Sequence, residues 1–201
     1  MTITNGYATA AELKARLDIA DYEDDSQLES VIEAVSRWID TNRNRRIYAA
    51  AETRYYTATE RDYIIVDDLL SVTTLSTDDN ADDSYETTWT ASDFLLMPFN
   101  APSQNRPYTS INISHATKYS FPANVFKGVK IIGSFGYAAA TPKPIKEACI
   151  LASMRVFKRK DILFGTQGSA ELGTVSAIAS ILRDGELNYI LDAVPRRVTY
   201  G

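Results

Sequence analysis

The sequence predicts an α+β fold, in which an N- and C-terminal α-helical bundle carries an inserted antiparallel β module. Apolar residues recur at helical spacing near both ends of the chain. Between residues 53 and 137, short runs rich in Thr, Tyr, Val and Ile alternate with Asp, Asn, Pro and Ser, which is typical of strands and turns. We therefore expect a helical domain from residues 1–52 and 138–201, and a β-rich domain at residues 53–137.

Two helices are expected before the β-rich segment. Thr9-Ala10-Ala11-Glu12 has the pattern of a capping box, in which the Thr9 hydroxyl and the Glu12 carboxylate satisfy backbone N–H groups, and Leu13 and Leu17 follow on one face. A second helix follows the acidic residues 23–26, which suit the positive end of a helix dipole. Its apolar residues form a narrow stripe: Leu28, Val31, Ile32, Val35, Trp38 and Ile39. Three arginines at its far end are interpreted as solvated charges, with contact to a phosphate or an acidic partner as the alternative: Arg43, Arg45 and Arg46.

The β-rich segment contains six predicted strands of four or five residues. They lie at residues 53–57, 63–66, 71–75, 85–89, 110–113 and 129–132. Their spacing predicts a small antiparallel sandwich or barrel. Loops tolerate inserted modules of this kind.

A long helix is predicted from about Pro144 to Lys160, because proline is tolerated in the first turn of a helix. Its apolar residues spread over more than one face: Ile145, Ala148, Cys149, Ile150, Leu151, Ala152, Met154, Val156 and Phe157. Such a helix needs a partner on each apolar face, and we expect one of these partners to be another copy of the chain. The glycine-rich residues 165–174 predict an exposed, mobile loop, a last helix spans about 184–194, and Pro195 ends it.

The composition restricts the classes of function. The 201 residues include 21 Lys and Arg against 26 Asp and Glu, a formal net charge of −5. Proteins that bind DNA phosphates regardless of sequence usually have a basic excess, which this chain lacks overall. The single cysteine, Cys149, can form neither an internal disulfide nor a structural zinc site, and we interpret it as a small buried residue. Residues 1–7 lack the features of a signal peptide and no apolar run is long enough to span a membrane, so we expect a soluble protein made inside the cell.

The acidic residues 78–83 place oxygen ligands at alternate positions, as a calcium loop does. An EF-hand needs Gly at its sixth position and Glu at its twelfth, where this chain has Asp83 and Trp89. We therefore predict a hairpin turn there. Asp67-Asp68 is interpreted as the solvated end of a strand.

Other polar groups are weak candidates for chemistry. His115 has no recognisable nucleophile motif beside it, and Gly165 and Gly168 lack the Lys-Ser/Thr of a phosphate loop. A basic group at the end of the long helix is interpreted as solvated, with contact to nucleic acid or an acidic neighbour as the alternative: Arg155, Lys158, Arg159 and Lys160. The numerous tyrosines suit an interface and a β core equally. We expect no catalytic residue, no cofactor and no metal.

Three stretches carry a resemblance to a known family. They are residues 10–18 with 24–40, residues 133–137 with 144–149 and 157–159, and residues 182–187 leading to Arg196-Arg197. Together they cover about half of the chain, and they resemble the head–tail connector (adaptor, or head-completion) proteins of long-tailed bacteriophages. The β insertion is larger than in smaller members, and Ala193-Val194-Pro195 stands where an aromatic residue before the arginines is more usual.

The resemblance implies a structural virion protein without enzymatic activity. Its copies would form a ring, usually of twelve subunits, beneath the portal protein and above a stopper or tail-completion protein. Packaged DNA would pass through the channel without sequence-specific binding, and the protein would be made in the host cytoplasm and contact no membrane. We expect the tail from Pro195 to reach the portal or a neighbouring subunit, and the loop 165–174 to face the channel or a partner. Candidate subunit or portal contacts are Trp38, Ala148, Ala152, Arg155, Phe157, Arg159, Arg196, Arg197 and Tyr200.

Two other functions fit parts of the sequence. The β module could bind a polysaccharide or a protein on a virion or cell surface, which a cluster of exposed aromatic residues on that module would indicate. A hydrolase would have to use Asp67, Asp68 and His115, and an activity screen of His115→Ala would test that possibility.

Overall fold

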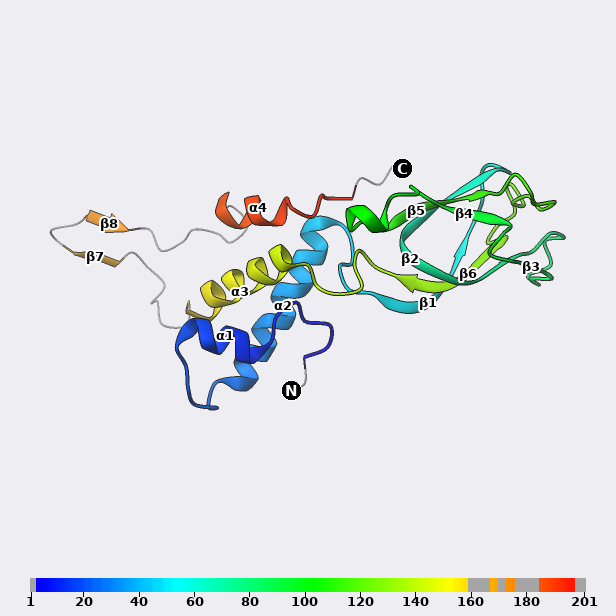
Figure 1. Ribbon diagram of the computed structural model, residues 1–201. Coiled ribbons are helices and arrows are strands. Elements are labelled where there is room, and N and C mark those ends of the chain that lie inside the picture. The colour runs from blue at the N-terminus through cyan, green and yellow to red at the C-terminus, as the bar shows by residue number, and fades with distance from the viewer. Residues whose placement is uncertain (1–2, 159–166, 170–172, 176–184, 198–201) are drawn as a thin grey trace. The chain divides into compact units, whose positions relative to one another are not determined.

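The computed structural model describes residues 3–158, 167–169, 173–175 and 185–197 (Figure 1). The chain divides into two compact units, one formed by Met1–Arg45 with Thr141–Gly201 and the other by residues 46–140. Within the described residues, the first unit contains four α-helices, and the second contains a six-stranded antiparallel sheet. The predicted α+β class is therefore confirmed.

The N-terminal helices begin as their sequences predict. Helix α1 spans Ala10–Leu17, and its capping box is complete because the Thr9 hydroxyl accepts a hydrogen bond from the Glu12 N–H while the Thr9 N–H donates to the Glu12 carboxylate. Helix α2 spans Asp25–Arg43. Its buried residues repeat at helical spacing: Leu28, Ile32, Val35, Ser36, Ile39 and Arg43.

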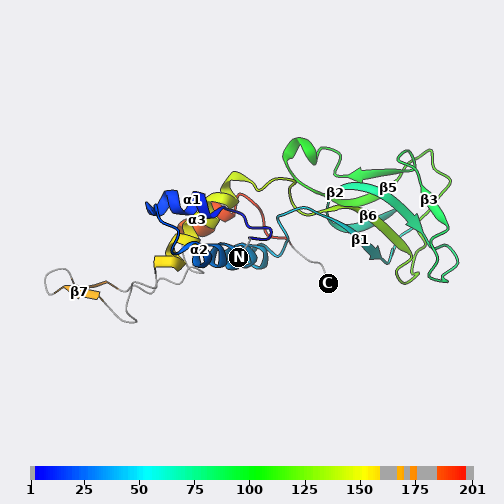
Figure 2. The ribbon, with the colours of Figure 1, turned by 90° about the horizontal axis from the view of Figure 1, so that it is seen from below.

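Helix α3, Lys143–Lys158, contacts α1, α2 and the last helix α4, Gly185–Leu191 (Figures 1 and 2). Its buried residues face these three neighbours: Ile145, Ala148, Cys149, Ile150, Ala152, Ser153 and Phe157. Helices of the same chain therefore cover most of the apolar surface of α3. Most of this helix therefore needs no second copy of the chain to cover it. Leu151, Met154 and Val156 are half-buried. Cys149 is buried, as predicted, with its Sγ 3.6 Å from the Ser36 Oγ.

The six strands form one antiparallel sheet in the order β1-β6-β2-β5-β4, with β3 paired to β2. Their bounds are β1 Ala50–Tyr56, β2 Tyr63–Thr77, β3 Thr87–Trp89, β4 Phe94–Met97, β5 Tyr108–Ile113 and β6 Val129–Phe135. A 3-10 turn, Pro102–Gln104, precedes β5. In the other unit, β7 (Gln167–Ser169) and β8 (Gly173–Val175) pair as a short hairpin where the sequence predicted a loop.

Strand β2 differs most from the prediction. It merges two predicted strands, so Asp67 and Asp68 lie within it and do not form a solvated strand end. The pairing register shifts between Ile65 and Leu69 on the β5 side and again along β6, so β2 contains bulges. Bulges bend a strand and admit residues that break its alternation, which allows one strand to pair with β5 along its first half and with β6 along its second.

The interior of the sheet unit is one apolar core. Strand β6 shows strict alternation, with Val129, Ile131 and Phe135 fully buried. Trp89 and Phe121 stack on each other at 4.8 Å between ring centroids, and the Trp89 Nε1–H donates to the Thr77 hydroxyl. These aromatic residues therefore belong to the core.

Candidate functional site

The predicted contact residues on α2 and α3 lie mainly inside the helical unit. Ala148 and Ala152 are fully buried, Phe157 is 7% exposed, and Trp38 is half-buried on α2. The first three therefore pack against helices of their own chain. Arg155 extends from α3 and donates to the Glu186 carboxylate of α4 at 2.9 Å. Its predicted neighbour in the basic group, Arg159, lies outside the described residues.

The start of the C-terminal tail lies against the end of α2. The Arg197 N–H donates to the Arg43 carbonyl at 2.9 Å, and the Asn44 side-chain amide donates to the Arg197 carbonyl at 3.1 Å. Arg196 is exposed, whereas Arg197 is half-buried. Tyr200 lies outside the described residues. The backbone of Arg197 is thus held by its own chain, and the contact of the tail with a partner stays a prediction.

The arginines at the end of α2 are engaged in internal ion pairs. Arg43 is 7% exposed and donates to the Asp192 carboxylate at 2.9 Å, which ties α2 to the residues after α4. Arg46 pairs with Glu52 and donates to the Phe135 carbonyl at 2.8 Å. The prediction of solvated charges is therefore wrong for Arg43 and Arg46, and their partners neutralise the charge that a phosphate would need.

A charged cluster joins β1 to β2 in the sheet unit. Arg54 bonds the Asp67 carboxylate at 2.8 Å and the Glu52 carboxylate at 2.9 Å, while its guanidinium lies 4.3 Å from the centre of the Phe135 ring. The Tyr56 hydroxyl donates to the same Asp67 carboxylate at 3.2 Å. Burial, assisted by the Asp67 charge, raises the pKa of Tyr56 to about 12. Burial favours a lower pKa for Arg54, but its carboxylate partners outweigh burial and the pKa is raised. The raised pKa values of Tyr56 and Arg54 mean that both side chains keep their protons at neutral pH.

Glu52 makes the stability of this cluster depend on pH. The hydrogen bond from Arg46 lowers the pKa of Glu52 below its ordinary value of 4.5, against the opposing effect of burial. A lowered folded-state pKa adds stability that is present above the unfolded value and lost as the pH falls through the folded value. We expect Glu52→Gln to reduce the unfolding free energy at pH 7 by about 1 kcal/mol. In urea unfolding, this deficit should shrink as the pH falls below 4.5; a deficit that is independent of pH would contradict the assignment.

The residues proposed for a hydrolase are not brought together. Asp67 is held by Arg54 and Tyr56, and the buried Asp68 is 4% exposed on β2. His115 lies after β5 and lines a cavity of about 530 Å³ with Asp62 and Leu95, among other residues, but neither Asp67 nor Asp68 lines it. Nothing in this arrangement provides a nucleophile and a base at hydrogen-bonding distance.

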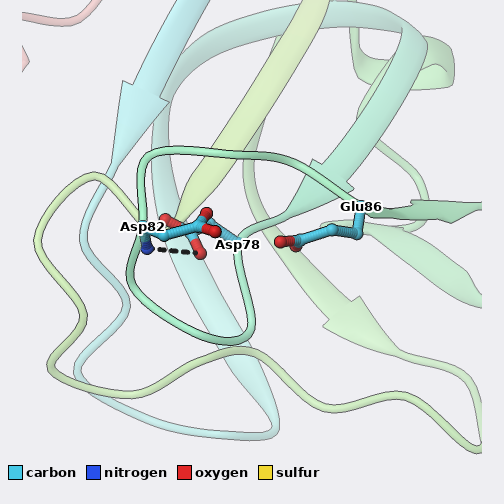
Figure 3. A group of neighbouring side chains, drawn as sticks. All are labelled: Asp78, Asp82 and Glu86. Atoms are coloured by element: carbon cyan, nitrogen blue, oxygen red, sulfur yellow. Dashed lines mark hydrogen bonds between the residues drawn. The ribbon is translucent and has the colours of Figure 1, made fainter.

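The loop between β2 and β3 carries the acidic residues that suggested a calcium site. Figure 3 shows the carboxylates of Asp78, Asp82 and Glu86 gathered together, with ligand atoms within 4.8 Å of one another. The buried Asp78 carboxylate already accepts hydrogen bonds from the backbone N–H groups of residues 80, 81, 82 and 83. Asp78 thus organises a loop in which Ala81 and Asp83 adopt positive φ angles. The predicted hairpin connection is confirmed, because β2 and β3 pair antiparallel on either side of this loop.

Removing the Asp78 carboxylate should destabilise this loop. Asp78→Ala leaves four backbone N–H groups without their acceptor, and we expect a loss of about 2 kcal/mol in unfolding free energy. Asp82→Ala is the matched control, since Asp82 is exposed and accepts only local bonds from Asn80 and Ser84. Because Asp78 is already satisfied, adding calcium should leave the melting temperature of the wild type unchanged. A clear rise in Tm with calcium would show instead that the loop holds a cation.

A surface that was not predicted, on which apolar side chains of β2 and β4 stand on either side of the polar Asn112 and Ser110 of β5, lies on the outer face of these strands. In the register, Tyr63 and Leu95 flank Asn112, and Ile65 and Met97 flank Ser110, so these side chains share one face of the sheet. The opposite face carries the core residues Ile64 and Ile111. Phe99 follows β4 and lines the 530 Å³ cavity with Leu95 and Met97. We name this surface the β4 face, formed by Tyr63, Ile65, Leu95, Met97 and Phe99.

Three of the five side chains of the β4 face are exposed, whereas Leu95 and Met97 are half-buried. Ile65 is 67% exposed, Phe99 60% and Tyr63 40%. One feature of the sequence indicates this exposed face. Residues 63–66, Tyr-Ile-Ile-Val, are apolar on both sides of a strand, whereas apolar and polar residues alternate in a strand that has one solvated face.

Solved structures share this fold along almost the whole chain. No protein-family model matches the sequence, and no curated protein matches it. A chain in the neck of an empty GTA particle, computed with C6 symmetry, is 16% identical with a TM-score of 0.59, over 100% of this chain and 95% of that chain. A chain in the neck of a native GTA particle, computed with C12 symmetry, is 17% identical with a TM-score of 0.57, over 100% and 96% of the two chains.

A third structure agrees with these two. A chain in the virion of a native gene transfer agent (GTA) particle is 16% identical with a TM-score of 0.54, over 96% of this chain and 91% of that chain. At these identities the matches establish a common fold, which includes the helices and the sheet. Separately, none of the helices in the described ranges combines the length and the apolar character that a bilayer crossing demands.

Proposed function

We propose that this chain is a structural protein of the neck of a phage-like particle, where it joins the head to the tail. The observation that carries the proposal is the full-length match to chains in GTA necks, because it includes both the helical unit and the sheet unit. The sequence also resembles head–tail connector proteins, which supports the same position in the particle. The resemblance lies in residues 10–18 with 24–40, residues 133–137 with 144–149 and 157–159, and residues 182–187 leading to Arg196-Arg197.

The proposed assembly is a ring of twelve copies beneath the portal protein. The C6 and C12 symmetry of the matched necks supports a cyclic arrangement. In this proposal the terminal helices form the connector bundle, and the ring extends the channel for packaged DNA towards a stopper or tail-completion protein. The acidic net charge of −5 suits a channel wall that DNA passes without being held.

A second candidate is a binding module on the particle surface. The exposed aromatic residues Tyr63 and Phe99 beside a 530 Å³ cavity favour it, because a polysaccharide or a protein could contact them there. In that case the helical unit would be monomeric.

Removal of the chain from the producing cells tests the proposed function. Cells in which its gene is inactivated should accumulate DNA-filled heads and separate tails, and a plasmid copy should restore joined particles. Electron microscopy of the lysate counts the DNA-filled heads, the separate tails and the joined particles. Normal joining without the chain would overturn the neck assignment, and joined particles that fail to attach to cells would favour the surface-binding module.

A further inference from the structure

The segment before α1 is anchored to α2 on both sides of Gly6. The Arg37 guanidinium donates to the Asn5 carbonyl at 2.9 Å, and the Tyr7 N–H donates to the Ser36 hydroxyl at 3.0 Å. The Tyr7 side chain is buried. A change in the length of the backbone between Asn5 and Tyr7 therefore has to be absorbed within a short span that is fixed at both ends.

Gly6 fits closely between these two anchors. A Cβ at this position would lie 2.3 Å from the Cγ2 of Ile3 and 3.3 Å from the Cγ2 of Ile32. Asn5 is exposed and has a φ of +55°, a conformation that asparagine adopts more readily than most residues. The fold therefore favours Asn-Gly at these positions, and the sequence contains no other Asn-Gly pair.

An exposed Asn-Gly pair can lose its side-chain amide without a catalyst. The Gly6 backbone nitrogen attacks the Cγ of Asn5, and the new C–N bond closes a succinimide ring. The bond between Cγ and Nδ2 breaks, and the departing amide takes the Gly6 N–H proton and leaves as ammonia. Water then opens the ring at either carbonyl, which gives aspartate or isoaspartate. The net reaction consumes a water molecule and releases an ammonia molecule.

Two features of the structure favour this reaction at Asn5. Gly6 has no side chain to hinder the approach of its nitrogen to the Cγ. Within the part of the chain that the structure describes, the Gly6 N–H donates to no acceptor at hydrogen-bonding distance. Its nitrogen therefore gives up no hydrogen bond when it reacts.

Two other exposed asparagines provide controls within the same chain. Asn80 and Asn100 are each followed by alanine, whose side chain hinders the attack. The Ala81 N–H donates to the Asp78 carboxylate at 2.8 Å, and the Ala101 N–H donates to a backbone carbonyl at 3.0 Å. Both nitrogens have to lose a hydrogen bond before they reach the neighbouring Cγ.

We infer that Asn5-Gly6 is a site of spontaneous deamidation, and that its isoaspartyl product loosens the N-terminal segment from α2. In isoaspartate the main chain runs through the former side chain, so it is longer by a methylene group. The Asn5 carbonyl that Arg37 binds becomes part of a free carboxylate. Gly6 has little room for the longer chain, so Tyr7 has to move away from Ser36. The reaction needs no partner and does not depend on the proposed place of the chain in a particle neck.

Incubation of the purified full-length chain at mildly alkaline pH tests the modification. Mass spectrometry of its peptides follows the conversion of amide to carboxyl at Asn5, Asn80 and Asn100, and protein isoaspartate methyltransferase labels the isoaspartyl product. We expect Asn5 to convert at least about fivefold faster than either control. A smaller ratio, or a product without isoaspartate, would overturn the inference and leave the neck assignment intact.

Two variants separate the effect of the longer backbone from that of the new charge. The wild type should lose a few degrees of Tm on incubation, as isoaspartate accumulates. Asn5→Asp carries the charge on an ordinary backbone beside Arg37, and it should melt like the fresh wild type. Asn5→Gln closes the corresponding larger ring far more slowly, so its Tm should not fall on incubation. An equal fall for the wild type and Asn5→Gln, or an Asn5→Asp variant as unstable as the incubated wild type, would contradict the loosening by isoaspartate.

Discussion

Replacement of Gly136 by alanine is expected to destabilise the sheet unit by about 3 kcal/mol or more. Gly136 has a φ of +148°, which L-residues rarely adopt, and a Cβ there would lie 2.2 Å from the carbonyl oxygen of Tyr48. The Gly136 N–H donates to the Asp68 carbonyl at 2.8 Å, and the next N–H, of Tyr137, donates to the Arg46 carbonyl at 3.0 Å. These bonds hold the backbone on both sides, so the clash cannot be relieved by a small shift. Urea unfolding followed by circular dichroism measures the loss.

Gly185→Ala is the matched control for this substitution. Gly185 is the first residue of α4, and a Cβ there would meet nothing within 4 Å. Because alanine favours helices over glycine by up to about 1 kcal/mol, stability should be unchanged or slightly raised. A Gly136→Ala variant as stable as Gly185→Ala would show that the β1–β6 end of the sheet is looser than these backbone hydrogen bonds indicate.

Replacement of Ala152 by leucine is expected to reduce the unfolding free energy of the isolated chain by about 1–3 kcal/mol. Ala152 is fully buried on α3, which α1, α2 and α4 surround, so the larger side chain has no room. If Ala152 served only a contact between copies, the isolated chain would tolerate leucine and only ring assembly would suffer. The experiment therefore separates the two roles that the sequence left open for this residue.

Ala34→Leu is the corresponding control, because Ala34 is an exposed residue of α2. Its effect should stay within about 0.5 kcal/mol, as for most surface substitutions. Equal stability of Ala152→Leu and Ala34→Leu, measured by denaturant unfolding, would mean that α3 is not packed as the structure shows.

The helices could be predicted from the sequence because the signals that define them are local. The capping box of Thr9 and Glu12 fixes the start of α1, and the stripe from Leu28 to Ile39 fixes the buried face of α2. Such signals depend on residues three or four positions apart. The sequence also showed that α3 has several apolar faces, but it could not show that the covering helices belong to the same chain.

The sheet was predicted less well because its form depends on distant residues. The bulges that make β2 one continuous strand arise from its pairing with β5 and β6. Strand β4, Phe94–Met97, was missed because Phe-Leu-Leu-Met has neither the alternation nor the β-branched residues that indicate a strand. The ion pair of Arg43 with Asp192 joins residues 149 positions apart, so its arginine looked solvated in the sequence.

The candidate site was predicted only in part for the same reason. The spacing of apolar residues predicts α3. Which face of the sheet Tyr63 and Ile65 occupy depends instead on the pairing of β2 with β5. Leu95 and Met97 join that face through pairing of β4 with β5, which no local pattern reveals.

Imaging of the neck tests the central proposal most directly. Particles are purified from cells in which this chain carries a small fluorescent or gold-binding tag, and the neck is reconstructed by electron cryomicroscopy without imposed symmetry. We expect a ring of this chain between the portal and the tail, with density that fits both the helical unit and the sheet unit. A neck built without this chain, or a tag found on the capsid surface or the tail tip, would contradict the proposal.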